Sequence, residues 1–170
     1  QAGIARVIQV SALGAAPDAA TEYWRSKGQA DAALSSSSLN WSIIRPSLIY
    51  AKQGRSCRVM CGIASLPLLT DWQGCGDVQP VHLDDVIALL LRLVESSITE
   101  REMINVVGPS AIPLSQWWQQ LRQAMGMRVA IEVKVLPWMQ QIVSATAQYI
   151  PSSLLSRDSL AMLRLGNCAD

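Results

Sequence analysis

Two short apolar runs separated by an alanine-rich stretch constrain the fold of this chain more than any other feature. Residues 5–12 and 41–44 are rich in valine and isoleucine and are bounded by turn residues, a pattern typical of buried parallel strands. The five alanines of residues 19–34 favour a helix between them. Strand, helix and strand within about 40 residues predict a βαβ unit with a right-handed crossover.

The ends of these elements carry recognisable signals. Asp18 or Thr21 is expected to cap the first helix, and Pro46 to end the second strand. An open parallel sheet binds ligands outside the carboxyl ends of its strands. We therefore expect a site near Ser11 and residues 46–50, where two strands end.

Further along the chain, several other elements are predicted. Asp84 or Asp85 opens an amphipathic helix, and Leu114 to Met125 forms another, with Ser115 as its cap and Gly126 as its stop. Strands are expected at residues 78–81, 103–107 and 131–136, a helix broken near Pro67 at residues 56–69, and helices at residues 137–149 and 157–163.

Composition excludes several classes of protein. Half of the 170 residues are hydrophobic and 16% are charged, which excludes a disordered segment. The net charge is +1 without a basic cluster, so nucleic acid is not an expected partner. Because no signal peptide and no run of 18 uncharged apolar residues occurs, we expect a cytoplasmic protein.

The cysteines give little support for a metal site. Cys57 and Cys61 would share one helical face, as a metal or redox pair would, but His82 is the only histidine and no C-x-x-C occurs. Reduced, partly buried thiols are the favoured interpretation, and no metal is expected.

A tyrosine and a lysine on the first helix suggest acid–base chemistry. Tyr23 and Lys27 are four residues apart, so both lie on one helical face, and Ser11 precedes the tyrosine by 12 residues. An ammonium group beside a phenol favours its ionised form, and such a phenol can exchange protons near neutral pH. A solvated helix turn that happens to carry both residues is the alternative.

These residues and their flanks resemble the second half of a short-chain dehydrogenase/reductase. In this chain, a strand ending in "VSALGA" is followed by a helix that contains "YWRSK" and by a strand ending in "IIRPSLIY". Two further stretches of the family come later, "PVHLDDV" at residues 80–86 and "NVVGP" at residues 105–109. The chain is most similar to atypical, extended members related to NmrA-like proteins and to the nucleotide-binding subunit of respiratory complex I.

The resemblance implies a role for each site residue. Tyr23 would be the general acid/base, Lys27 would support the ionised tyrosine and bind the nicotinamide ribose, and Ser11 would orient the substrate oxygen. By the same resemblance, the backbone at Pro46, Ser47 and Ile49 would approach the nicotinamide.

Five further residues are expected to be structural. Arg45 would pair with an acid below the sheet, and His82, with Asp85, would cap and pack. Of the adjacent Trp117 and Trp118, one is expected to face the core and the other to be exposed.

The implied fold class is α/β: the C-terminal half of a doubly wound Rossmann-like NAD(P)-binding fold with a small, mostly helical substrate domain. Residues 1–50 and 82–108 would form the Rossmann-like part, and residues 51–81 and 109–170 the substrate-binding region. The family's G-x-x-G-x-x-G stretch does not occur, so the N-terminal nucleotide-binding half is expected to be missing. The exposed sheet edge left behind would favour self-association.

The expected function is that of an NAD(P)-dependent oxidoreductase acting at a carbonyl or alcohol carbon of a small, apolar substrate, with NAD or NADP as cofactor of the full-length protein. The 170-residue chain alone is expected to bind the cofactor weakly and to be inactive. The alternatives are a non-catalytic NAD(P)-binding scaffold or redox sensor, and a stand-alone interaction domain.

Overall fold

The computed structural model describes residues 3–4, 6–72, 76–95, 101–135 and 165–169. The chain divides into two compact units. Unit 1 comprises residues 1–49, 79–109 and 168–170, and unit 2 comprises residues 50–78 and 110–167. The helices predicted at residues 137–149 and 157–163 lie outside the described residues.

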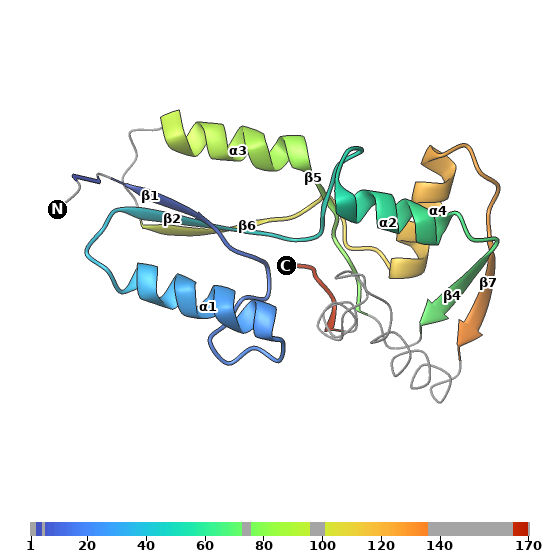
Figure 1. Ribbon diagram of the computed structural model, residues 1–170, viewed down its shortest axis with the longest axis horizontal. Helices are drawn as coiled ribbons and strands as arrows, with labels where there is room; N and C mark the ends of the chain where they lie inside the picture. The colour runs from blue at the N-terminus through green and yellow to red at the C-terminus, as the bar shows by residue number, and fades with distance from the viewer. Residues whose placement is uncertain (1–2, 5, 73–75, 96–100, 136–164, 170) are drawn as a thin grey trace. The chain divides into compact units, whose positions relative to one another are not determined.

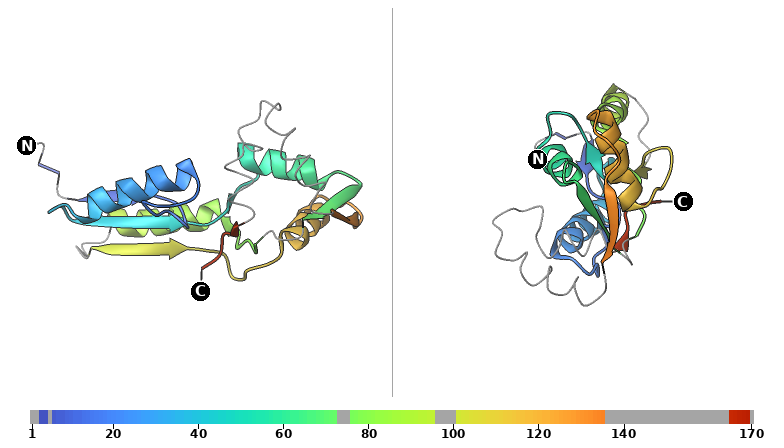
Figure 2. Two further views of the ribbon diagram at one scale, coloured as in Figure 1. Left: turned by 90° about the horizontal axis from the view of Figure 1, so that it is seen from below. Right: turned by 90° about the vertical axis from the view of Figure 1, so that its right-hand side faces the viewer.

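Unit 1 is built on a three-stranded parallel sheet. Its strands are β1 (Val7–Val10), β2 (Trp41–Pro46) and β6 (Glu102–Val106), in the order β1-β2-β6. Helices α1 (Glu22–Ser35) and α3 (Leu83–Glu95) lie on opposite faces of this sheet (Figures 1 and 2). The predicted βαβ unit, a parallel β1–α1–β2 arrangement, is confirmed.

The start and packing of α1 follow from a few residues. The Thr21 side chain accepts a hydrogen bond from the Trp24 amide at 3.3 Å, so Thr21 is the N-cap of α1. It is one of the two residues that were predicted for this role. Trp24, Gly28 and Asp31 are the buried residues of the helix, spaced so that they share one face. At Gly28 the helix touches the loop after β1: an added Cβ would lie 2.1 Å from the Ala16 carbonyl carbon.

The face of the sheet covered by α3 is mainly aliphatic. Ile44 of β2, Val81 and Val86 form a buried cluster. Partly buried side chains of three elements pack against it: Ile49, Leu89, Leu90, Leu93, Ile104 and Val106. Leu89, Leu90 and Leu93 thus form the apolar face of the predicted amphipathic helix, which begins at Leu83 and not at Asp84 or Asp85.

Unit 2 contains helices α2 (Arg55–Ala64) and α4 (Leu114–Ala124) and a parallel pair of strands, β4 (Leu68–Trp72) and β7 (Ile131–Val135). The buried Arg122 side chain connects them, because it donates hydrogen bonds to the carbonyls of Ala64, Leu66 and Arg128. Arg122 on α4 thus provides hydrogen-bond donors to one carbonyl at the end of α2 and to one carbonyl before each of the two strands.

Three predictions in this unit are corrected. The residues after Pro67 form β4 instead of continuing a broken helix, because they pair with β7 as parallel strands. Ser115 lies inside α4, whose N-cap is Pro113. Trp117 and Trp118 are both buried, because α4 packs against α2 as well as β4 and so buries two sides. The predicted stop at Gly126 is confirmed by its φ of 71° directly after the C-cap.

Two short strands, β3 (Ile49–Tyr50) and β5 (Val81–His82), complete the described elements. The strand predicted at residues 78–81 is thus shifted, and Val78 makes only isolated bridges. Within the described residues, no helix combines the length and the apolar character that crossing a bilayer requires.

Candidate functional site

The carboxyl ends of the parallel strands define the candidate site. Val10, Ile44 and Ile104 are in register across β1, β2 and β6, so the three strands end at one edge of unit 1. Helix α1 runs back along the sheet after β1, which places its first turns near this edge. Ligands of open parallel sheets bind outside such an edge.

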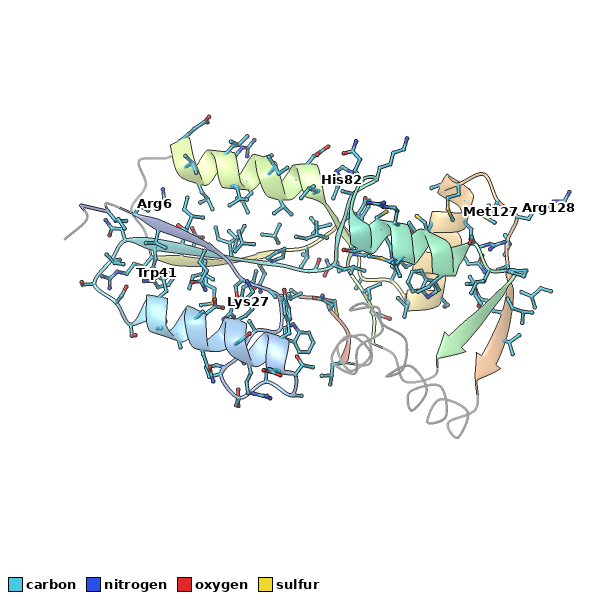
Figure 3. All side chains as sticks on the ribbon, viewed as in Figure 1. Arg6, Lys27, Trp41, His82, Met127 and Arg128 are labelled. Atoms are coloured by element: carbon cyan, nitrogen blue, oxygen red, sulfur yellow. The ribbon has the colours of Figure 1, made fainter. Side chains whose placement is uncertain are left out.

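Lys27 is held at this edge by the backbone. Its Nζ donates a hydrogen bond of 3.1 Å to the carbonyl of Val10, the last residue of β1. Figure 3 shows Lys27 between α1 and the sheet. An ammonium group has three donors, and this contact uses one of them. Two N–H groups of Lys27 therefore remain for a ligand with hydroxyl or carbonyl oxygens.

Tyr23 lies one turn before Lys27 and is 45% exposed. Its carbonyl accepts from the Ser26 hydroxyl, which is ordinary helix-surface geometry. Among the described residues, no hydrogen bond joins the Tyr23 phenol to Lys27 or Ser11. Helix periodicity nevertheless puts the two side chains on one face, as the sequence predicts, with the phenol open to solvent.

Ser11 is engaged elsewhere. Its hydroxyl donates a 2.8 Å hydrogen bond to Asp31 Oδ2, and the residue is only 4% exposed. Asp31 lies eight residues after Tyr23, a rise of about 12 Å along an α-helix. The structure therefore joins Ser11 to the third turn of α1 and not to the phenol in its first turn.

Asp31 is the centre of a buried polar network beneath the sheet. Its carboxylate accepts hydrogen bonds from Arg45 Nε at 2.9 Å and from Gln9 Nε2 at 2.5 Å, and Arg45 Nη2 lies 2.8 Å away in an ion pair. With Ser11, three hydrogen bonds and this ion pair reach a residue that is 2% exposed. A buried carboxylate needs such partners, because an unpaired one would cost several kcal/mol.

The network confirms the predicted role of Arg45, which pairs with an acid below the sheet. Sequence reasoning did not identify the acid itself. Its signal was nevertheless present, because Asp31 follows Trp24 and Gly28 at helical spacing on the face that α1 buries. An acid on the buried stripe of a helix implies a basic partner on the facing strand.

The predicted cofactor residues Pro46, Ser47 and Ile49 are anchored through their backbone or side chains. The Pro46 carbonyl accepts from the Leu13 amide, and the Ser47 amide donates to the Val106 carbonyl, both at 2.9 Å. The Ile49 side chain packs against the Ile44 cluster. These contacts join the segments that leave all three strands into one layer at the carboxyl edge.

Gln79 contributes to this layer, which sequence reasoning missed. The residue is buried; its side chain donates to the Gly108 carbonyl at 2.8 Å, and its backbone carbonyl accepts from the Ser47 hydroxyl. Gly108 is required here, since an added Cβ would lie 2.0 Å from the Pro80 carbonyl oxygen. The adjoining "NVVGP" and "QPVH" stretches are thus packed on each other.

His82 has a local structural contact. Its Nδ1 accepts from the Asp84 amide at 3.2 Å, in the first turn of α3, and lies 3.5 Å from the Asp84 carboxylate. The expected capping role is therefore observed, although its acidic neighbour is Asp84 and not Asp85.

The described residues fit one end of a dinucleotide. The free donors of Lys27 suit ribose hydroxyls, and the exposed Tyr23 phenol suits a reacting oxygen. The pyrophosphate requires a glycine turn before a helix, which this sequence lacks.

Comparison with protein families gives a match over residues 1–65 to a family described as NAD(P)H-binding. The matched range contains β1, α1 and β2, and hence Ser11, Tyr23, Lys27 and Asp31. A comparison with curated proteins gives no significant match.

Several solved structures have a similar fold. A nucleoside-diphosphate-sugar epimerase from Staphylococcus aureus is 14% identical with a TM-score of 0.68, over 94% of this chain and 54% of that one. The UDP-glucose 4-epimerase of Thermotoga maritima, solved with UDP-glucose, is 15% identical with a TM-score of 0.58, over 79% and 52%. DesIV, a dTDP-glucose 4,6-dehydratase from Streptomyces venezuelae solved with NAD, is 16% identical with a TM-score of 0.58, over 79% and 49%.

These findings confirm the predicted α/β fold with a parallel sheet of the Rossmann-like, NAD(P)-binding kind. They also agree with the predicted resemblance to extended short-chain dehydrogenase/reductases, since the neighbours are of the epimerase and dehydratase type. The chain spans about half the length of the solved structures that it matches.

Proposed function

We propose that the chain is part of an NAD(P)-dependent oxidoreductase. The proposal proceeds from its NAD(P)-binding Rossmann-like fold of the epimerase/dehydratase type. The proposed reaction is hydride transfer at a carbonyl or alcohol carbon of a small substrate. The observation that carries the proposal is the hydrogen bond from Lys27 to the Val10 carbonyl. It holds the Tyr-x-x-x-Lys pair at the edge where this fold binds its ligands.

Each side chain has a separate task in the proposed reaction. When bound, NAD(P) supplies or accepts the hydride. Tyr23 gives a proton to the substrate oxygen during reduction and removes it during oxidation. Lys27 uses its remaining donors to bind the nicotinamide ribose. The carboxyl-edge backbone at Pro46, Ser47 and Ile49 lines the nicotinamide, and a separate nucleotide-binding half supplies the glycine turn.

The hydrogen bond that Ser11 makes in the structure conflicts with its predicted role. Its proton is already donated to Asp31, so the hydroxyl would have to leave a buried carboxylate before it donated to a substrate oxygen. This observation favours the second candidate, a non-catalytic NAD(P)-binding protein, in which the nucleotide is bound but no substrate oxygen is held. The two candidates differ in turnover and not in binding.

The test compares turnover and binding in matched variants. The chain, extended by whatever its gene encodes before Gln1, is assayed for NADH and NADPH oxidation with aldehydes and quinones, and for NAD and NADP reduction with UDP-glucose. Tyr23→Phe is expected to lower the rate by about 10²-fold or more, because general acid–base catalysis contributes that much. Cofactor binding, followed by fluorescence titration, should be unchanged in this variant.

Two variants serve as controls. Ser36→Ala removes an exposed hydroxyl at the other end of α1, away from the candidate site, and it should leave the rate unchanged. Lys27→Ala should weaken both binding and turnover, whereas Lys52→Ala, at an exposed site, should weaken neither. Equal rates for Tyr23→Phe and the unmodified protein would contradict the catalytic assignment. Binding without turnover of any substrate would establish the non-catalytic candidate instead.

A further inference from the structure

Two cysteines of unit 2 lie one turn apart on α2 with their sulfur atoms facing each other. Cys57 Sγ and Cys61 Sγ are 3.9 Å apart. Both are free thiols; Cys57 is buried and Cys61 is half-buried, so the pair is open to solvent on one side. The sequence alone favours plain thiols, and the close approach of the two sulfur atoms is what changes this interpretation.

Helix geometry disfavours a disulfide between them. A disulfide needs sulfur atoms about 2.05 Å apart and Cβ atoms about 3.5–4.5 Å apart. Residues four apart on a helix hold their Cβ atoms about 5–6 Å apart. Closing the bond would therefore pull the sulfur atoms together by nearly half of their separation and deform α2.

A single bridging atom fits the same geometry better. Metal–thiolate bonds are about 2.3 Å long, so a linear sulfur–metal–sulfur unit spans about 4.6 Å. The sulfur atoms of Cys57 and Cys61 would move apart by less than 1 Å to reach that separation. Small side-chain rotations supply such a change while the helix stays intact.

The number of ligands decides which kind of ion would bind. In the part of the chain that the structure describes, no group of three or more histidine, cysteine, aspartate or glutamate side chains could hold a metal. Structural zinc requires four ligands and calcium six to eight oxygens. Two sulfur ligands alone suit a soft ion of low coordination number, of which monovalent copper is the biological example.

We propose that Cys57 and Cys61 form a two-sulfur binding site for monovalent copper or a soft ion of the same coordination. On binding, two S–H bonds break, two sulfur–copper bonds form and two protons leave to solvent. No electron is transferred, and the occupied site carries one negative charge.

The test is an anaerobic titration of the 170-residue chain with monovalent copper against a chromogenic copper(I) chelator. One copper ion per chain is expected at this site. Cys57→Ser and Cys61→Ser should each weaken binding by about tenfold or more, because one of two ligands is lost. Cys168→Ser removes an exposed thiol of unit 1 and should leave the affinity unchanged.

Other outcomes would overturn the proposal. Unchanged affinity in both Cys57→Ser and Cys61→Ser, or its loss in Cys168→Ser or Cys75→Ser, would place the copper elsewhere. Far-UV circular dichroism checks that each variant folds. If a serine variant unfolds, phenylarsine oxide, which bridges two close thiols with loss of one water molecule, is applied to the unmodified chain. Peptide mass mapping should then find one arsenic shared by Cys57 and Cys61, and separate single-thiol adducts would contradict the site.

Discussion

The two faces of the sheet in unit 1 are stabilised in different ways. Beneath α1, the buried carboxylate of Asp31 is surrounded by Arg45, Ser11 and Gln9. Beneath α3, the core is a cluster of aliphatic side chains around Ile44. Aliphatic neighbours can replace one another at modest cost, whereas each member of the polar network needs its particular partners. The α1 face therefore specifies which helix docks and in what register, and it does so next to the candidate site.

The largest expected effect comes from removing the carboxylate. Asp31→Ala leaves the Arg45 guanidinium, whose side chain is 21% exposed, without its counter-charge. Breaking such a pair costs about 3–5 kcal/mol of unfolding free energy. Chemical denaturation measures the loss, and Asp18→Ala, at an exposed loop position, is the control that should stay within about 0.5 kcal/mol.

A double variant sharpens the interpretation. Asp31→Leu combined with Arg45→Leu replaces both charges by apolar groups, so no buried charge is left unpaired. Its stability should exceed that of Asp31→Ala. A double variant no more stable than the single one would show that shape or the remaining polar partners, and not the charge pair, dominate this face.

The second effect tests the aliphatic face. Ile44 is fully buried, and Ile44→Ala should cost about 2–4 kcal/mol through lost burial and the cavity that remains. Ile44→Val, which removes one methylene group, should cost about 0.5–1.5 kcal/mol. A graded response of this kind would distinguish this face from the all-or-none response expected at Asp31. A large loss in Ile44→Val would contradict the contrast between the faces.

The smallest effect concerns the start of α1. Thr21→Ala removes the acceptor of the Trp24 amide and should cost about 1 kcal/mol. Thr21→Ser keeps the acceptor and should recover most of that stability. Hydrogen exchange of the Trp24 amide reports the cap directly, and unchanged exchange in Thr21→Ala would mean that the cap contributes nothing.

Much of unit 1 was predictable because its signals are local. Apolar runs, alanine-rich segments and turn residues located β1, α1 and β2, and the leucine spacing located α3. The boundary of α3 was missed by one or two residues, since it depends on a contact from His82 to the Asp84 amide. Such a contact requires the side-chain geometry of the folded chain.

The candidate site was predictable only in part. Helical spacing places Tyr23 and Lys27 together, but nothing local reveals that Ser11 donates to Asp31, 20 residues later. In unit 2, β4 pairs with β7, whose partner residues are about 60 positions away, so the sequence around Pro67 gave no sign of a strand. Pairings over such distances are decided by the tertiary fold and not by local preference.

The close approach at Gly28 limits how this helix can vary in length. Since the glycine fits against Ala16 with no space for a methyl group, α1 is fixed in both rotation and translation at that point. One residue inserted between Lys27 and Gly28 would turn the preceding part of the helix by about 100°. Lys27 would then lose its hydrogen bond to the Val10 carbonyl, while Asp31 would keep its ion pair with Arg45. Point substitutions on the outer surface of α1 are thus tolerated far more readily than any insertion or deletion within it.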